Sequence, residues 1–406
     1  MCFVTVPHPL GMISKEEVNA KVDAAFDDIV KAATAWTPSK EKQDAQVKPY
    51  PAKRFKFSGT YADVNDMFQK RKWSLSLPIV PPTVDKVAAM LKGTKRNPAE
   101  VLWVVPPRQG MLTVELVAAL GVMAGAKPEH MPLLIATVEA MADPVAAWRG
   151  PTTTTAATVP VFFISGPIIE KLKLNPGTGT AGGENPVTNA LGYFVNLVGD
   201  VVGGSVPPNF DKSTHGSSAD LVAMVFTENA KENPWKTTYA EEAGFKPGDS
   251  IVTHFSAYLG NANIDHDSKT GQRLLTTLST GLLGSASGLA SCLADYDASY
   301  AINNKVSFAF IVLCPEHAAT IAKDFPDQRA ARDFMRETAA MPYKFYSQET
   351  CVPGKDFGPY DENTFIPRFK KTESIKFFVS GGPGKQSQIW VPFPQVFKPV
   401  SKKIAE

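Results

Sequence analysis

The 406-residue sequence has few cysteines and little net charge, and each scarcity excludes a class of protein. Its four cysteines lie far apart without a Cys-X-X-Cys pair, so neither a disulfide scaffold nor a structural zinc site is expected. The 42 basic and 40 acidic residues give a formal charge of +2, which provides no basic field for nucleic acid. We therefore expect reduced thiols and no nucleic-acid partner.

Long apolar runs and a secretory signal are also absent from the sequence. No apolar run approaches the roughly 18 residues needed to cross a bilayer. The N-terminus, MCFVTVPHPLGMISKEEV, lacks the charged and then apolar pattern of a signal peptide. The sequence therefore predicts a soluble cytoplasmic protein with no membrane partner.

Hydrophobic residues make up 44% of the chain, and they occur in short runs that alternate between strand and helix patterns. Apolar strand patterns at 100–107 and 159–167 interleave with helical patterns at 113–125 and 128–143. This alternation favours an α/β fold in which most strands are buried on both faces. The same alternation of apolar strand and helix patterns continues in further segments, namely 220–229, 249–258, 271–283 and 306–325.

The expected organisation has four parts. An N-terminal helical arm and linker, 1–79, precedes a first α/β half, 80–205, and a related second half, 206–345. A C-terminal β extension, 346–406, contains a glycine-rich turn between two β runs. Within the arm, the capping-box pattern SKEE predicts a helix over 14–36.

The tripeptide Pro-Glu-His occurs twice, at 128–130 and 315–317, each time at the start of a predicted helix. A helix N-terminus disfavours imidazolium, so His317 should be neutral and suited to be a general base, a donor or a metal ligand. The same reasoning predicts a lowered pKa for Cys314. Glu129 holds the matching place in the first copy.

A structural interpretation of the second copy is the alternative. In that case Glu316 caps the helix, His317 packs with one hydrogen bond, and Cys314 is a small buried apolar residue.

Other polar residues also follow predicted strands, where ligands collect in α/β proteins. Arg108 precedes a helix and could bind a carboxylate or phosphate in bidentate fashion. Glu228 and Asn229 follow an apolar strand, and the loop DKSTHG, from Asp211, precedes that strand. The catalytic candidates are Glu228, His317, His215 and Glu129, and the substrate-binding candidates are Arg108, Asn229, Ser213 and Thr214.

No cofactor is implied with certainty. The glycine-rich segments 175–185 and 380–387 could present amides to an anion, but they fit neither the P-loop nor the dinucleotide-binding pattern. A transition metal is the alternative left open, with ligands drawn from His215, His254, Asp265 and His266.

Seven segments, taken in order, resemble a bacterial family associated with the UGSC protein, a small protein named for its selenocysteine-or-cysteine, Gly, Ser, Cys motif. The segments are PPRQGMLTVELVAALGVMAGAKPEHMPLLIATVEAM, SGPIIEKLKLNPGTGTAGGEN, DKSTHG, FTENAKENPW, AGFKPGDSIVT, VLCPEHAATIAKD and VSGGPGKQS. The resemblance covers about 80–395. It implies a subunit of a catabolic or redox enzyme in which this chain supplies the substrate pocket and the small partner supplies a reactive thiol or selenol.

The resulting prediction is an intracellular enzyme subunit, in a homo- or hetero-oligomer, that acts on a small anionic organic molecule. Thiol- or selenol-linked redox chemistry or reductive cleavage, together with a small UGSC-type partner, is the favoured reaction. A cofactor-free or metal-assisted lyase or hydrolase and a non-catalytic scaffold subunit are the alternatives.

Overall fold

The computed structural model describes most of the chain. The described residues are 4, 6, 13–35, 50–206, 214–258, 260–284, 308–345, 361–369, 371–393, 396 and 398–405. They belong to two units, Met1–Lys48 and Pro49–Glu406. Within the described part of the chain, no helix combines the length and the apolar character needed to cross a membrane.

The first unit contains the helix α1, Lys15–Thr34. Its predicted capping box is present, because the Ser14 hydroxyl accepts the N–H of Glu17 at 3.2 Å while the Glu17 carboxylate accepts the N–H of Ser14 at 2.8 Å. These bonds satisfy donors that have no partner inside the helix. The helix predicted over 14–36 is confirmed to within two residues at each end.

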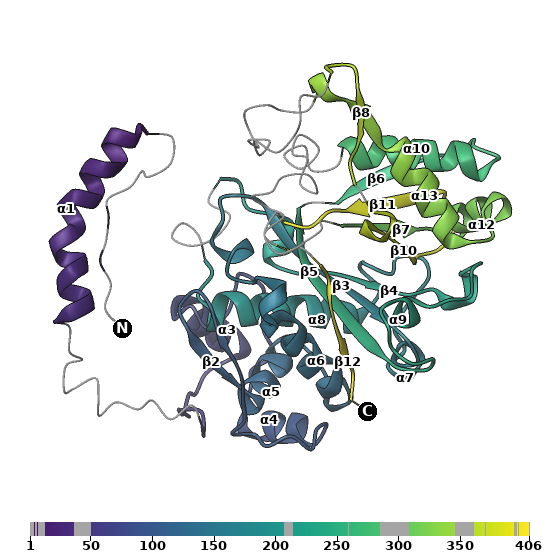
Figure 1. Cartoon of the computed structure of the whole chain (residues 1–406). Coiled ribbons are helices and arrows are strands. Elements are labelled where there is room, and N and C mark those ends of the chain that lie inside the picture. Colours follow the sequence, from purple (N-terminus) through teal and green to yellow (C-terminus); the bar gives the residue numbers. More distant parts are fainter. Residues whose placement is uncertain are drawn as a thin grey trace. The chain divides into compact units, whose positions relative to one another are not determined.

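The second unit contains two four-stranded sheets (Figure 1). The first sheet has the order β12–β5–β3–β4, with β12 at Val400–Lys403, β5 at Ile251–Tyr258, β3 at Thr158–Ser165 and β4 at Met224–Thr227. In it β3 and β4 are parallel, whereas β5 is antiparallel to both β3 and β12. The second sheet has the order β10–β7–β11–β6, with β10 at Ile375–Val379, β7 at Ala309–Leu313, β11 at Gln386–Trp390 and β6 at Asn261–Ile264. Here β10 and β7 are parallel and β11 is antiparallel to its neighbours.

A cluster of aromatic side chains packs the two sheets face to face. The Phe163 ring on β3 lies 4.4 Å from Phe310 on β7 and 4.8 Å from Phe378 on β10, measured between ring centroids. Phe226 and Phe255 pack on the same ring from the neighbouring strands. Aromatic pairs at such distances contribute about 1 kcal/mol each beyond the area they bury, so this cluster is a main source of sheet-to-sheet stability.

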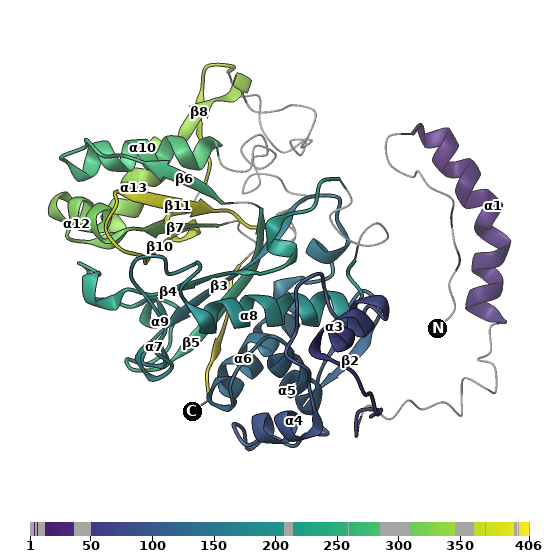
Figure 2. The ribbon, with the colours of Figure 1, turned by 180° about the vertical axis from the view of Figure 1, so that it is seen from behind.

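Helices cover the outer face of each sheet, which gives four layers (Figure 2). Over the first sheet lie α3 Tyr61–Lys70, α4 Val84–Leu91, α5 Val114–Met123, α6 Met131–Ala142 and α8 Pro186–Asn196. Over the second lie α10 Gly271–Gly284, α12 Pro315–Asp324 and α13 Gln328–Thr338. The short helices are α7 Ile168–Lys171 and α9 Tyr239–Glu242. The strands β1 Val101–Val105 and β2 Gly110–Thr113 form a hairpin, and β8 Ala340–Pro342 pairs antiparallel with β9 Phe365–Pro367.

The predicted α/β fold is confirmed, and β3 and β7 are buried along their whole length as expected. The strand predicted over 100–107 differs, because β1 pairs only with β2 and leaves one face exposed. The division into halves at 205/206 stays a prediction, and this boundary falls between β3 and β4, which are neighbours in one sheet.

Candidate functional site

Glu228 lies directly after β4, where the parallel strands β3 and β4 end together. Its carboxylate accepts the N–H of Tyr239 at 2.7 Å and, in a short contact, the hydroxyl of Ser165 at the end of β3. The residue is only 3% exposed. Burial raises the pKa of Glu228 to about 7, although both hydrogen bonds act in the opposite direction. This carboxyl can therefore hold a proton near neutral pH.

Asn229 connects the end of β4 to the glycine-rich loop between β10 and β11. Its N–H donates to the Val379 carbonyl at 2.8 Å, and its side-chain amide donates to the Gly381 carbonyl at 3.1 Å. Gly381 in turn donates to the Pro176 carbonyl at 2.9 Å. The two glycine-rich segments of the sequence thus lie side by side at the carboxyl ends of the strands.

His317 lies near the start of α12 and is buried between two hydrogen-bond partners. Its Nε2 lies 3.1 Å from the Asp265 carbonyl, which can only accept, so Nε2 carries the hydrogen. Its Nδ1 therefore accepts from the Ser387 hydroxyl at 2.8 Å. Burial lowers the pKa of His317, which agrees with the expected neutral state.

Two expectations for the same turn are wrong. Burial raises the pKa of Cys314, because desolvation of the thiolate outweighs the nearby backbone donors that lower it. Glu316 does not cap α12. Its carboxylate reaches across to the β10–β11 loop and accepts the N–H groups of Gly384 at 2.6 Å and Lys385 at 2.9 Å.

Arg108 lies at the other end of β4 from Glu228. The Asn196 side chain, at the end of α8, donates to the Ala219 carbonyl at 2.7 Å, and Ala219 precedes β4. The helix α8 therefore ends beside the residues that precede β4. The chain continues from the end of α8 to Gly203, whose carbonyl accepts the N–H of Arg108 at 2.9 Å. The structure therefore does not bring Arg108 to the carboxyl ends of the strands.

The remaining predicted residues are also spread over the unit. Thr214 and His215 are exposed and precede a short 3-10 turn, Ser218–Asp220, on the amino side of β4. Glu129 is exposed in the 3-10 turn that begins α6. Ser213 and Asp211 lie outside the described residues. The structure thus places Glu228 beside Asn229, whereas the hydrogen bonds of His317 go to Ser387 on β11 and to the Asp265 carbonyl.

The metal alternative finds no cluster in the part of the chain that the structure describes. No three histidine, cysteine, aspartate or glutamate side chains converge among those residues as a metal site would require. His254 is fully buried within β5, whereas His266 is exposed in the loop after β6.

A pocket of about 650 Å³ lies at the end of α6, beside the β1–β2 hairpin. Aromatic side chains form much of its wall, and the rings of Trp103 and Trp148 meet edge to face with 5.8 Å between centroids. The residues that line it are Trp103, Pro106, Met141, Ala142, Asp143, Pro144, Ala147, Trp148, Arg149, Gly150, Thr153, Thr154 and Phe393. Polar groups, among them Asp143, Arg149 and Thr154, line the pocket together with these rings, so a ligand there would meet hydrogen-bonding partners as well as aromatic surface.

Two charged residues line this pocket, Asp143 and Arg149, and only the charge of Asp143 is balanced by an ion pair among the described residues. Burial alone would raise the pKa of Asp143, but Lys402 at 2.7 Å and the N–H of Val145 lower it overall, so Asp143 is an anion paired within the fold. Arg149 is exposed, and none of the described carboxylates pairs with its guanidinium. A guanidinium in this position can bind a carboxylate in bidentate fashion.

The sequence reasoning missed the pocket, since segments far apart in the chain build it. Trp103 comes from β1, Trp148 and Arg149 follow α6, and Phe393 follows β11. Only the turn-rich stretch WRGPTTTT, 148–155, could have drawn attention to this region. A scan against protein-family models finds no match to the chain, and a search of the curated proteins finds none either.

Proposed function

We propose that the chain binds a small organic anion in the pocket beside Trp148 and serves as the substrate-binding subunit of an enzyme. The observation that carries the proposal is the presence in one pocket of an unbalanced cation, Arg149, and of the side chains of Trp103, Trp148 and Phe393. The aromatic faces would bury the apolar body of the ligand, and the guanidinium would hold its carboxylate.

Glu228 takes no part in this site. It lies at the carboxyl end of β3, whereas Thr154 and the pocket precede the amino end, so the eight residues of that strand separate them by about 23 Å. Glu129 lies roughly 18 Å from Met141, at the other end of α6. We infer that the reacting group reaches the ligand from outside this chain, which is compatible with a thiol or selenol of a small UGSC-type partner.

Isothermal titration calorimetry with benzoate and 3-phenylpropionate tests the binding site. We expect Arg149→Gln to weaken binding about tenfold or more, since a charge-assisted hydrogen bond contributes roughly 1.5–3 kcal/mol. Arg273→Gln, which removes an exposed arginine from α10, is the matched control and should leave the affinity unchanged. Absence of binding to the native protein, or equal weakening by both substitutions, would contradict the proposal.

A further inference from the structure

Basic and aromatic side chains occur together on the surface around α3. Between residues 50 and 73 the chain carries six basic and two acidic residues, whereas the whole chain balances 42 basic against 40 acidic residues. The near-zero charge of the chain therefore hides a local positive excess. We name the following exposed residues the basic–aromatic surface: Phe55, Lys56, Phe57, Lys70, Arg71, Lys72 and Trp73.

Packing between two segments of this surface holds Arg71 in place. The Phe55 ring lies 5.4 Å from the Trp73 ring, measured between centroids, and Trp73 also packs edge to face on the buried Phe68 at 5.7 Å. The guanidinium carbon of Arg71 lies over both exposed rings, 4.8 Å from the centroid of Trp73 and 5.7 Å from that of Phe55. These contacts fix the guanidinium, and its N–H groups remain able to bind an anion.

The cations of this surface have no carboxylate partners. In the described part of the chain, neither Arg71 nor any of the three lysines of the surface forms an ion pair. Lys72 adopts a φ of 56°, a left-handed conformation that is disfavoured for a residue with a Cβ. Glycine would adopt it without strain, so folding alone does not account for a lysine at this position. The surface thus presents positive charge that a partner could neutralise.

A cavity of about 390 Å³ opens within the same surface. Phe57 and Met67 line it with apolar atoms, and Lys70 and Arg71 line it with positive charge. Phe57 is 44% exposed, so its ring is available for contact with another molecule. A ligand that fills this cavity must therefore combine an apolar group with negative charge.

The carboxylates that line the cavity select among anionic partners. Asp63 caps α3, where it accepts the N–H of Thr60 at 2.7 Å, but no described residue bonds to the exposed carboxylate of Asp66. This carboxylate repels the phosphates of a nucleic acid, whereas a peptide brings N–H groups that it can accept. Base stacking is also hindered, because Arg71 already lies over the Trp73 ring. A peptide therefore fits the surface better than a nucleic acid.

We propose that the basic–aromatic surface is a docking site for a peptide segment of another protein, in which acidic residues flank an apolar side chain. The acidic residues bind Arg71 and the lysines, and the apolar side chain enters the cavity beside Phe57 and Met67. None of the residues of this surface lines the pocket beside Trp148. The docking site therefore stands or falls separately from the proposed anion site.

Fluorescence anisotropy with labelled synthetic peptides on the full chain tests the proposal. The probe carries one phenylalanine between two runs of glutamate. One control peptide replaces the phenylalanine by alanine, and the other replaces the glutamates by glutamine. We expect each control to bind about tenfold more weakly than the probe, because each loses one of the two groups that the surface recognises. The affinity of the probe should also fall as salt is added.

A pair of variants locates the binding. The test variant changes all three lysines of the basic–aromatic surface to glutamine and should weaken binding of the probe about tenfold, since each exposed charge contributes little by itself. The matched control changes three exposed lysines elsewhere in the second unit, namely Lys246→Gln, Lys269→Gln and Lys323→Gln. It should bind the probe as the native protein does, and both variants should melt at the native temperature.

Three results would overturn the proposal. The first is that the native protein does not bind the probe, and the second is that both lysine variants weaken binding equally. The third is that single-stranded oligothymidylate binds more tightly than the probe, which would identify the surface as a nucleic-acid site.

Discussion

Burial sets the protonation states of the side chains at the strand ends. Glu228 is held closer to its neutral form than an exposed glutamate, and the thiol of Cys314 is held in its protonated form. His317 is also kept neutral by burial, with both ring nitrogens in hydrogen bonds. All three side chains are buried from solvent. Glu228 and His317 use their hydrogen bonds to connect segments that are far apart in the sequence.

Glu228 should make the stability of the protein depend on pH. Its pKa rises from 4.5 to about 7 on folding, so the native state binds more protons than the unfolded state between these values. Stability contributed by the neutral carboxyl is present below pH 4.5 and is lost as pH rises through 7, by about 3 kcal/mol in total. Glu228→Gln removes this loss.

Urea denaturation at pH 5 and pH 8 measures the effect. The free energy of unfolding of Glu228→Gln relative to the native protein should increase from the lower pH to the higher one. Glu129→Gln, which changes an exposed carboxylate, provides the baseline. A difference between Glu228→Gln and the native protein that stays constant with pH, or shrinks as pH rises, would show that folding does not raise the pKa of this carboxyl.

At the scale of elements, close backbone contacts fix the helices that position the pocket. Gly93 ends the α4 segment against the turn that begins α6, and a Cβ at this position would lie 1.8 Å from the Pro128 carbonyl oxygen. Gly183 has no atom within 4 Å of its Cβ position and no left-handed backbone. Replacing each glycine by alanine therefore compares a crowded position with an open one.

Gly93→Ala should therefore destabilise the protein by about 2 kcal/mol, because the added methyl forces α4 away from the start of α6. Gly183→Ala should be neutral or slightly stabilising, since it only restricts the unfolded chain. Thermal unfolding of both variants measures the difference. Equal melting temperatures would show that the backbone between α4 and the start of α6 can shift to accommodate the added methyl group without a loss of stability.

Much of the element scale could be predicted from the sequence. The capping box of α1, the start of α5 after Thr113, and the strand–helix pair of β7 and α12 follow from local signals that tertiary packing did not overrule. The pairing of strands could not be predicted, because β10 and β11 flank β7 and do not form a hairpin across their glycine-rich turn. The exposure of β1 could not be predicted either, since it depends on which strand pairs with it.

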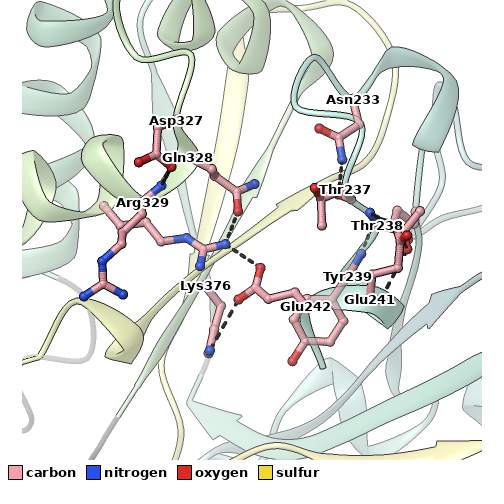
Figure 3. Close-up of polar contacts among 12 residues, drawn as sticks. Asn233, Thr237, Thr238, Tyr239, Glu241, Glu242, Asp327, Gln328, Arg329 and Lys376 are labelled. Carbon is pink, nitrogen blue, oxygen red and sulfur yellow. Dashed lines mark hydrogen bonds and ion pairs between the residues drawn. The ribbon is translucent and has the colours of Figure 1, made fainter. Parts of the chain in front are cut away.

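At the scale of the molecule, an ion-pair network joins α9 to α13 and to β10 of the second sheet. Glu242 on α9, which follows a strand of the first sheet, contacts Lys376 on β10 at 3.3 Å and Arg332 on α13 in a short contact. Figure 3 shows Glu242 between Lys376 and the segment that carries Gln328. The side chains of Arg332 and Glu242 are only 11% and 17% exposed, so water screens them weakly.

Glu242→Gln should lower the free energy of unfolding by about 3 kcal/mol, because it leaves two partly buried cations without their carboxylate. Glu373→Gln breaks the pair with Arg329, whose side chains are 59% and 63% exposed, and should cost less than about 1 kcal/mol. Chemical denaturation of both variants gives the comparison. Similar losses for the buried and exposed pairs would contradict this role for the network.

The candidate site was the part of the molecule least accessible to sequence reasoning. Residues after strands were sensible candidates, and Asn229 does bond to the β10–β11 loop, while Glu228 bonds to Ser165 and Tyr239. Arg108 follows a hairpin strand that belongs to neither large sheet, so it lies elsewhere. The pocket draws on turns and helix ends from distant segments, which leave no periodic signal in the sequence.

Hydrogen–deuterium exchange with and without saturating benzoate tests most directly where the anion binds. Benzoate should slow exchange in peptides covering 101–106 and 143–154, which contribute Trp103, Trp148 and Arg149 to the pocket. Exchange at 227–232 and 376–387, around Glu228 and the β10–β11 loop, should not change. Protection confined to those strand ends, with none around Trp148, would contradict anion binding in the pocket and would place the site at the carboxyl ends of the strands.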